Sequence, residues 1–399
     1  MIFKYYFEYK PNSISEPDFS KAWLELKTTP LKKLKRWWKT PKERLVMNMI
    51  NFTSIVEESR KTSSFLKKNA KILLMVYLFE EEKLPRDYIV ELVGIWNFPE
   101  KDLLMIEKDW QKIQDKIKAG KAHELSEWDT LYLWACTKAA DSKKRTKQPF
   151  SREMAKPRAF SLKAWYIKTI VESFEKEMKE ESLLKDFSIL SKESFEEYVK
   201  KKFTTYIWLS PQEIAEKLWV KLSSSKQYLD ILSKKILWIK WNKIEKIEEF
   251  KKANMTMKTM RLNTKGTPEE GISFPAFSYK EIVSQNWYES EVLQTMDKRF
   301  FFVIYQYDEN GKLALKKTMF WNLPYNDLNI VIKKVFDETK QKIVEWDYDN
   351  FTKISDRRIS HIRPHGANKK TVNEWPDWKV HETKCFRLNA KYIADQIKQ

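Results

Sequence analysis

Apolar runs and helical spacings divide the N-terminal half of the chain into predicted strands and helices. Residues 17–35, which include WLELKTTPL, are typical of a strand that runs into a basic segment. Residues 68–82 (KNAKILLMVYLFEEE) carry the continuous apolar run of a buried strand. From Pro99 onward, apolar residues recur at i, i+3 and i+4, which predicts a helix that ends near Gly120. The pattern therefore predicts a mixed α+β unit.

The C-terminal half shows a second set of elements after a helical connector. Residues 204–240 have helical spacing, and SPQEIAEKL begins with a Ser N-cap and a Pro in the first turn. Residues 298–321 form two apolar strands around the turn at 308–311, which predicts a hairpin. The sequence NDLNIVIKKVFDETKQKIVE then predicts an amphipathic helix. We expect a domain at 1–203, a connector at 204–246 and a second domain at 247–399.

Charge changes this picture by indicating a polyanionic partner. The chain has 75 Lys and Arg residues against 56 Asp and Glu, a net charge of +19. Basic residues gather at 31–44, at 138–168 and in ISHIRPHGANKK near the C-terminus. Such stretches neutralise phosphates, although any one of them could be a solvated charged face. Nucleic acid or a membrane surface is the expected partner.

Other features exclude several classes of protein. No apolar run is long enough to span a bilayer, and the N-terminus lacks the basic and apolar regions of a secretory signal. Two cysteines, Cys136 and Cys385, cannot make a disulfide framework or a zinc cluster. We therefore expect a soluble, cytoplasmic protein, in which His123 and Cys136 are structural residues.

One short motif carries candidate chemistry. Asp18, Glu25 and Lys27 follow the pattern D-x6-E-x-K. Side chains alternate along a strand, so Glu25 and Lys27 share a face that Asp18 can approach from the preceding turn. Two carboxylates suit Mg²⁺, and a lysine beside them can stabilise charge on a reacting phosphate. The alternative is a surface strand with its charges outward, because the motif is short.

A faint internal repeat accompanies the motif. FKKANMTMKTMRL at 250–262 matches SKAWLELKTTPL if Lys258 is laid on Lys27. Glu249 then falls on Asp18, and Thr256 replaces Glu25. The match predicts a second copy that has lost a metal carboxylate. Chance similarity of two short strands is the alternative.

Sequence blocks along the whole chain resemble the MutH-like nucleases, meaning the mismatch-repair nickase MutH and the larger two-domain type II restriction enzymes that cut GATC. DFSKAWLELKTTP resembles their catalytic segment, and the other matching blocks occur in the same order. These are LKKLK, PKERLVMNMINF, TSSFLKKN, GKAHELSE, YLWACTKAA, QPFSREMAKPRAFSLK, HIRPHGANKK and CFRLNAKYI.

The resemblance implies an α/β (mixed α+β) chain of two MutH-like domains, the second a degenerate copy that binds DNA without cutting it. Asp18 and Glu25 would hold Mg²⁺, and Lys27 would be the catalytic lysine. Double-stranded DNA would be the substrate, and a cognate DNA methyltransferase would belong to the same system. Two chains could pair transiently on DNA. The alternatives are a MutH-type nickase and a non-catalytic sequence-specific DNA-binding protein.

Basic residues in the matching blocks are the candidates for DNA contact. They are Lys32, Lys33, Lys35, Arg36, Lys67, Lys68, Lys138, Lys156, Arg158, Arg363 and His365. MutH relatives also carry a glutamate on a helix upstream of the first aspartate. Since only seventeen residues precede Asp18, we expect either that the true start lies upstream or that this helix is lost.

Glycine is scarce in this chain and tryptophan is abundant. There are 6 glycines and 17 tryptophans, although turns need glycine wherever φ is positive. Trp110, Trp287, Trp321 and Trp96 suit aromatic positions. Eleven others stand where the relatives have glycine or where a turn is expected: Trp23, Trp37, Trp38, Trp128, Trp134, Trp165, Trp208, Trp219, Trp238, Trp241 and Trp378. The hypothesis is a gene in which UGA encodes glycine; the alternative is a lineage that accumulated tryptophan.

Overall fold

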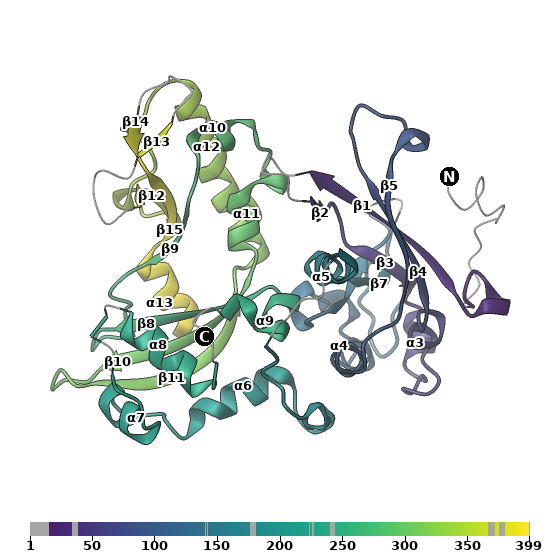
Figure 1. Ribbon diagram of the computed structural model, residues 1–399, viewed down its shortest axis with the longest axis horizontal. Helices are drawn as coiled ribbons and strands as arrows, with labels where there is room; N and C mark the ends of the chain where they lie inside the picture. Colours follow the sequence, from purple (N-terminus) through teal and green to yellow (C-terminus); the bar gives the residue numbers. More distant parts are fainter. Residues whose placement is uncertain are drawn as a thin grey trace. The chain divides into compact units, whose positions relative to one another are not determined.

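The computed structural model divides the chain into two compact units (Figure 1). It describes residues 16–33, 39–139, 141, 143–175, 181–222, 224–225, 227–239, 244–365, 372–374 and 380–398. Unit 1 contains the residues up to Glu197 together with Lys246–Asn254, and unit 2 contains Tyr198–Glu245 and the chain from Met255 onward. Residues 204–245 of the expected connector at 204–246 thus belong to unit 2, while Lys246 and the residues that follow it up to 254 belong to unit 1.

Unit 1 is built on two small sheets. The first has, in spatial order, β2 (Lys39–Pro41), β1 (Glu25–Lys33), β4 (Ile72–Leu78) and β5 (Val90–Trp96). β1 runs parallel to β4, and β5 runs antiparallel to β4. The second sheet has, in spatial order, β3 (Leu45–Met49), β7 (Arg158–Leu162) and β6 (Leu133–Thr137), all antiparallel. The predicted strands at 17–35 and 68–82 are therefore confirmed as β1 and β4.

Helices cover these sheets and complete the core of unit 1. They are α2 (Phe52–Ile55), α3 (Ser64–Lys68), α4 (Glu100–Lys118), α5 (Ala164–Glu175) and α9 (Glu248–Lys252), while α6 (Phe195–Thr204) crosses the unit boundary. α4 is the predicted helix after Pro99, and Gly120 follows it with φ +72°. Tyr132 and Tyr166 stack at 4.8 Å between ring centroids and are buried, as is Trp110. Apolar burial of this kind supplies most of the stability of a domain.

A buried ionic cluster explains why 246–254 belongs to unit 1. Lys252 Nζ on α9 donates to both oxygens of Asp102 on α4, at 2.7 and 2.6 Å, and also pairs with Glu248 at 2.7 Å. Tyr166 Oη donates to Asp102 at 2.8 Å. Burial opposes the charged form of Glu248, but Lys101 and Lys252 lower its pKa below the ordinary value. The partners around Asp102 fix α9 against α4 and α5.

Unit 2 also contains two principal sheets. The first has, in spatial order, β11 (Leu313–Asn322), β10 (Arg299–Tyr307) and β8 (Met255–Leu262). The second has β12 (Ser360–Pro364), β15 (Lys384–Leu388) and β9 (Ile272–Ala276), and a separate ribbon pairs β13 (Val372–Glu374) with β14 (Val380–Glu382). Its helices are α7 (Pro211–Lys217), α8 (Tyr228–Ile236), α10 (Tyr279–Ser284), α11 (Glu291–Met296), α12 (Lys333–Val344) and α13 (Ala390–Lys398). β10 and β11 form the predicted hairpin at 298–321.

The two units repeat one topology. β8 runs parallel to β10, which pairs antiparallel with β11, as β1, β4 and β5 do in unit 1. The order β9-β15-β12 repeats β3-β7-β6. FSLKAWYI at 160–167 leads from β7 into α5, and FRLNAKYI at 386–393 leads from β15 into α13, with five identities in eight positions. The expected mixed α/β fold with a second copy is therefore confirmed, and chance similarity of two short strands does not explain it.

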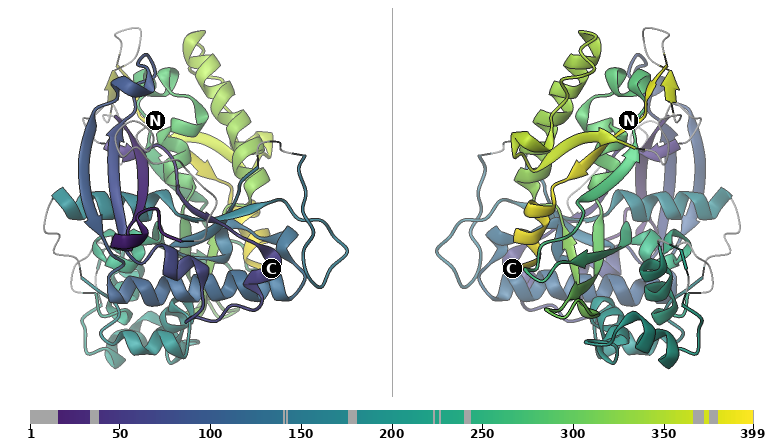
Figure 2. Two further views of the ribbon diagram at one scale, coloured as in Figure 1. Left: turned by 90° about the vertical axis from the view of Figure 1, so that its right-hand side faces the viewer. Right: turned by 90° about the vertical axis from the view of Figure 1, so that its left-hand side faces the viewer.

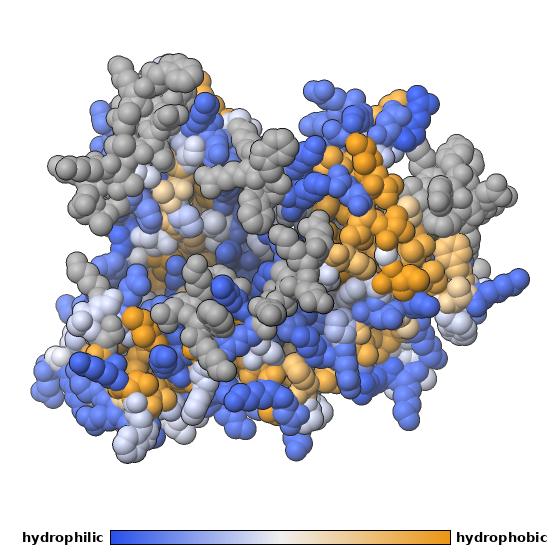
Figure 3. All heavy atoms as spheres, viewed as in Figure 1, coloured by the Kyte–Doolittle hydropathy of each residue, from blue (hydrophilic) through white to orange (hydrophobic). Residues whose placement is uncertain are grey.

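Part of the apolar surface of unit 1 faces solvent. β5 is an edge strand that leaves Val90, Val93 and Ile95 exposed, and Figure 3 shows an apolar area over this strand.

Within the described residues, none of the helices is both long and apolar enough to cross a bilayer.

Candidate active site

A tight hairpin brings Asp18 beside the start of β1. Phe19 and Leu24 exchange backbone hydrogen bonds of 2.9 and 3.3 Å across the turn formed by Ser20–Ala22 and Trp23. Trp23 closes this turn in the left-handed conformation, with φ +50°. The hairpin therefore folds the chain back so that Asp18 lies alongside Glu25.

The two carboxylates each accept a backbone hydrogen bond from the opposite arm of the hairpin. The Asp18 N–H donates to Glu25 Oε2 at 3.1 Å, and the Leu26 N–H donates to Asp18 Oδ2 at 3.1 Å. Glu25 is 2% exposed. Asp18 Oδ1 accepts no hydrogen bond from the described residues. The predicted pair is thus brought together, with one carboxylate oxygen available to a further ligand.

Lys27 lies on the same face of β1 as Glu25, as its spacing predicts. Its Nζ donates to Glu25 Oε1 at 2.8 Å and to the backbone oxygen of Met47 on β3 at 2.7 Å. Lys27 therefore bridges the two sheets of unit 1, and a lysine ammonium has three N–H groups, of which these contacts use two.

Lys68 is a fourth member of the site that the sequence analysis placed among the DNA-contacting residues. It ends α3, its side chain is 11% exposed, and its Nζ lies 3.8 Å from Glu25 Oε1. The neighbouring Asn69 donates to Asn48 Oδ1 on β3 at 3.1 Å, which fixes the end of α3 against the strand that supplies Met47. Two ammonium groups thus face one buried carboxylate.

This donor set fits a small divalent cation. Mg²⁺ is commonly bound by one or two carboxylates, with waters and substrate phosphates completing its octahedron. Asp18 and Glu25 supply two carboxylates; the described residues contain no group of three or more His, Cys, Asp or Glu side chains suited to a metal, so waters and phosphate oxygens would complete the coordination. The lysines keep the net charge of the site near zero before an ion binds.

Most of the predicted DNA-contacting residues of unit 1 lie at the surface. Lys33, Lys67, Lys138 and Lys156 are exposed, and Lys32 is half-buried. Lys35 and Arg36, together with Trp37 and Trp38, lie outside the described residues. Lys138 and Lys156 stand at the base of the segment between β6 and β7, which Figure 2 shows as a loop reaching away from the sheets.

The β6–β7 segment, residues 138–157, is a basic surface with an ordered base. Thr146 and Ala155 exchange backbone hydrogen bonds at 2.8 and 3.0 Å. Gln148 is bonded to the Ala122 N–H at 2.7 Å and to His123 Nδ1 at 2.9 Å. His123 therefore has a structural partner, in agreement with its expected structural place.

Arg158 lies inside unit 1, where it has a structural role. It is 6% exposed, and its guanidinium donates to the backbone oxygens of Ala135 at 3.0 Å and Leu125 at 2.9 Å. Burial lowers its pKa below that of a free arginine. Its basic neighbours suggested DNA contact, but the structure corrects this: the side chain supports the strands below the loop.

Unit 2 keeps the fold of this site and changes its side chains. Lys258 is paired with Phe302 of β10 as Lys27 is paired with Leu74 of β4, and Thr256 takes the place of Glu25. Met296, at the end of α11 and 0% exposed, corresponds to Lys68 at the end of α3.

Glu249 does not act as a second Asp18. Its carboxylate accepts hydrogen bonds from the Leu183 and Leu184 N–H groups and from Ser182 within unit 1. The alignment of Glu249 with Asp18 is therefore wrong. Unit 2 has no counterpart of the carboxylate pair at the described positions.

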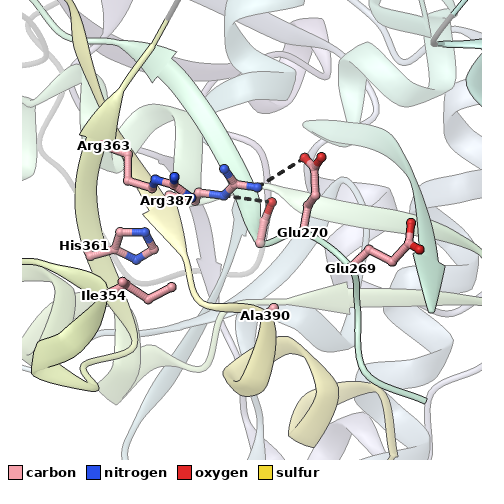
Figure 4. A pocket seen from close by; sticks show the side chains of 8 residues that line it. Glu269, Glu270, Ile354, His361, Arg363, Arg387 and Ala390 are labelled. Carbon is pink, nitrogen blue, oxygen red and sulfur yellow. Dashed lines mark hydrogen bonds and ion pairs between the residues drawn. The ribbon is translucent and has the colours of Figure 1, made fainter. Parts of the chain in front are cut away.

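A pocket of about 320 Å³ lies over the second sheet of unit 2 (Figure 4). His361, Arg363 and Arg387 line one side, and Arg387 is bonded to Glu270 at 3.2 Å and to the Gly271 oxygen at 3.2 Å. Burial lowers the pKa of His361; Asn389 opposes this shift, and Arg363 and Arg387 add smaller lowering effects. Arg363 and His365 are exposed at the base of the segment that follows β12.

The repeated fold, the adjacent carboxylates with two lysines, and the basic surface loop are typical of endonucleases. Comparison with known proteins agrees with this class. The family model described as "DNA mismatch repair enzyme MutH" matches residues 7–109, which include Asp18, Glu25, Lys27 and Lys68.

The type II restriction enzyme Sau3AI of Staphylococcus aureus is 33% identical over 449 aligned positions, covering 99% of this chain and 91% of that enzyme. The chain belongs to the MutH-related family of type II restriction endonucleases.

Proposed function

We propose that the protein cuts duplex DNA at 5′-GATC with Mg²⁺ held by Asp18 and Glu25. The single observation that carries the proposal is that backbone hydrogen bonds across the hairpin hold these two carboxylates side by side, next to Lys27 and Lys68. The preference for GATC rests on the resemblance of sequence blocks along the chain to enzymes that cut this site. Mg²⁺ rests on the number and type of the oxygen donors.

Asp18 would hold the ion through Oδ1, and Glu25 would contribute Oε1, which also accepts a hydrogen bond from Lys27. A bound Mg²⁺ would polarise the scissile phosphate and offset charge on the leaving oxygen. The backbone hydrogen bonds to Glu25 Oε2 and Asp18 Oδ2 orient both carboxylates before substrate arrives. Such preorganisation avoids reorganisation during the reaction.

Lys27 positions and stabilises the reacting groups. Its contacts with Glu25 and Met47 fix the ammonium and leave one N–H to donate to the attacking water or to a phosphate oxygen. Lys68 adds a second positive charge next to Glu25, where the negative charge of the phosphate increases in the transition state.

DNA would bind along exposed basic residues in both units. In unit 1 these are Lys32, Lys33, Lys67, Lys138 and Lys156, and Lys35 and Arg36 remain predictions. In unit 2 they are Arg363 and His365, while Thr256 in place of an acid leaves this copy as a binding rather than a cutting unit. Phosphate contacts of this kind give salt-dependent affinity.

The described part of one chain holds one such carboxylate pair, so cutting both strands suggests either transient pairing of two chains on DNA or two successive nicks. A cell that contains this enzyme would need a cognate DNA methyltransferase to protect its own sites, with no direct contact between the two proteins implied.

The test is incubation of supercoiled plasmid that carries GATC sites with the protein and Mg²⁺. Defined linear fragments are the expected product, and a plasmid without GATC is the matched control. Nicked circles alone would favour the mismatch-repair nickase, and a gel shift without cutting would favour a DNA-binding protein. Fragments from the control plasmid would contradict the GATC specificity.

Ion dependence is tested in the same assay. Chelation by EDTA should stop cutting, and added Mg²⁺ should restore it. Ca²⁺ should support DNA binding without cutting. Its bonds to oxygen are longer and its coordination geometry is more flexible than those of Mg²⁺, so it should not hold the phosphate in the geometry that hydrolysis requires. Cutting at full rate in EDTA would contradict the metal assignment.

A further inference from the structure

Five tryptophans adopt a backbone conformation that suits glycine. Their φ values are +50° at Trp23, +69° at Trp208, +56° at Trp219, +61° at Trp238 and +62° at Trp346. In this left-handed region the Cβ atom of an L-residue crowds the following carbonyl oxygen, so mainly glycine, and sometimes asparagine, adopts it routinely. For a bulky residue a positive φ is an outlier.

Three of these tryptophans end helices in the same way. In the Schellman motif, the residue after the C-cap is left-handed and two N–H groups bond back to the last turn. Trp219 after α7, Trp238 after α8 and Trp346 after α12 donate to the oxygens of Glu216, Lys235 and Ile343 at 3.0, 2.9 and 3.3 Å. The next residue in each case, Val220, Ile239 or Asp347, makes the second bond, at 3.0, 3.2 or 2.9 Å.

The same chain provides the expected residues for this motif elsewhere. Gly120 ends α4 with φ +72° and bonds to Ile117 at 2.9 Å. Asn254 ends α9 with φ +50° and bonds to Lys251 at 3.1 Å. The backbone geometry is therefore ordinary for glycine or asparagine. Among the described residues, Phe150 and Arg357 also have positive φ, at +59° and +54°, and tryptophan accounts for five of the eight non-glycine positions.

Packing does not compensate for the strained backbone. The five side chains are between 55% and 95% exposed. Among the ring contacts described, Lys316 lies over Trp208 and Tyr348 lies beside Trp346. By contrast Trp110, Trp287 and Trp321 are buried with negative φ, and the last two donate to Asn329 and Gln396.

We propose that glycine stands at positions 23, 208, 219, 238 and 346 in the protein as its source cell makes it, because UGA there encodes glycine. The inference does not rest on the nuclease function. The backbone conformation adds Trp346 to the eleven tryptophans that the sequence analysis identified as possible glycine positions. Three members do not meet the backbone criterion: Trp128 lies in a 3₁₀ turn, Trp134 in β6 and Trp165 in α5. Trp37, Trp38, Trp241 and Trp378 lie outside the described residues.

The codons give the first test. We expect UGA at the five positions and UGG at Trp110, Trp287 and Trp321, which serve as matched controls within the gene. Mass spectrometry of peptides from the source cell should then find glycine at the five positions. UGG codons at these positions, or tryptophan in the native peptides, would overturn the proposal.

Thermal unfolding gives an independent test. A variant with Trp→Gly at 23, 208, 219, 238 and 346 should have a higher Tm than the tryptophan-containing chain, by about 2–4 °C per site. The matched variant with Trp110→Gly, Trp287→Gly and Trp321→Gly should unfold at a lower temperature or fail to fold. An unchanged or lower Tm for the first variant would contradict the inference.

Discussion

Unit 1 and unit 2 share a strand order but differ at the positions where chemistry would occur. Glu25 corresponds to Thr256 and Lys68 to Met296, while Lys27 and Lys258 occupy the same place on the first strand of each unit. The apolar neighbours on β4 and β10 are kept in both units. The fold thus depends on the central strands, and the site can be lost without losing the fold.

The loops after the second sheets show the same relation. The Lys138 N–H bonds to the Pro157 oxygen at 3.0 Å in unit 1, and the His365 N–H bonds to the Thr383 oxygen at 2.8 Å in unit 2. Each bond lies where two antiparallel strands enter the segment that connects them. The backbone closure is thus shared by the two units, whereas among the described residues the carboxylate pair occurs in unit 1 alone.

The largest expected effect comes from the two matched lysines. Lys27→Ala removes the ammonium that bridges Glu25 and Met47, so kcat for plasmid cutting should fall at least about 1000-fold with DNA binding largely retained. Lys258→Ala, at the equivalent position of unit 2, should leave kcat unchanged. Equal losses in both variants would mean that unit 2 also has a catalytic site.

Lys68→Met puts the residue of unit 2 into unit 1 and should lower kcat by about 100-fold, because one of two positive charges beside Glu25 is lost. Single-turnover cleavage on saturating DNA measures this step. The reciprocal Met296→Lys should leave kcat unchanged and lower the Tm of unit 2, because it buries an unpaired ammonium. Full activity of Lys68→Met would remove Lys68 from the site.

Smaller effects are expected for the loop residues. Lys138→Ala and Lys156→Ala should each weaken DNA binding and lower the slope of log K against log salt by about 0.9 per lost phosphate contact. Fluorescence anisotropy at several salt concentrations measures the slope.

Arg158→Ala should instead cost about 1–3 kcal/mol of folding stability, because it leaves the Ala135 and Leu125 oxygens unpaired. An unchanged Tm would contradict its structural role.

The smallest expected effect is on the stability of the folded protein at acid pH, through His361 on β12. Trp134 occupies the matching position on β6 of unit 1 and serves as the comparison. The folded pKa of His361 lies below 6.5, so the unfolded chain takes up a proton first as the pH falls. Unit 2 should therefore lose stability as the pH falls below 6.5 toward the folded pKa, and the loss should level off once both forms of the chain are protonated.

His361→Phe should remove this part of the pH dependence, whereas Trp134→Phe should leave it unchanged, since neither Trp nor Phe titrates. Thermal midpoints measured between about pH 7 and pH 5 test the sign. A His361→Phe variant that keeps the full acid sensitivity would show that other groups cause it.

Alternation along a strand predicted that Glu25 and Lys27 share a face, but the short motif left an outward-facing surface strand open. The resemblance to the MutH-like nucleases was needed to select Asp18, Glu25 and Lys27 as the site. Lys68 joins them only through the packing of α3 and the pairing of β1 with β4, which no local pattern shows. Arg158 was misassigned because a basic stretch indicates charge and not burial. The glycine-like tryptophans were predicted at helix ends, but Trp346 was missed, since its surroundings have the pattern of an ordinary amphipathic helix.

The salt bridge between Asp102 and Lys252 has a practical consequence for anyone who wants the nuclease half alone. The two residues are 150 positions apart, so a fragment that ends at residue 203 contains Asp102 but lacks Lys252. In that fragment Asp102 is a buried carboxylate without its lysine partner, and the truncated protein should misfold or aggregate. Fusing 246–254 back onto the fragment through a short linker, or supplying it as a peptide, should rescue solubility.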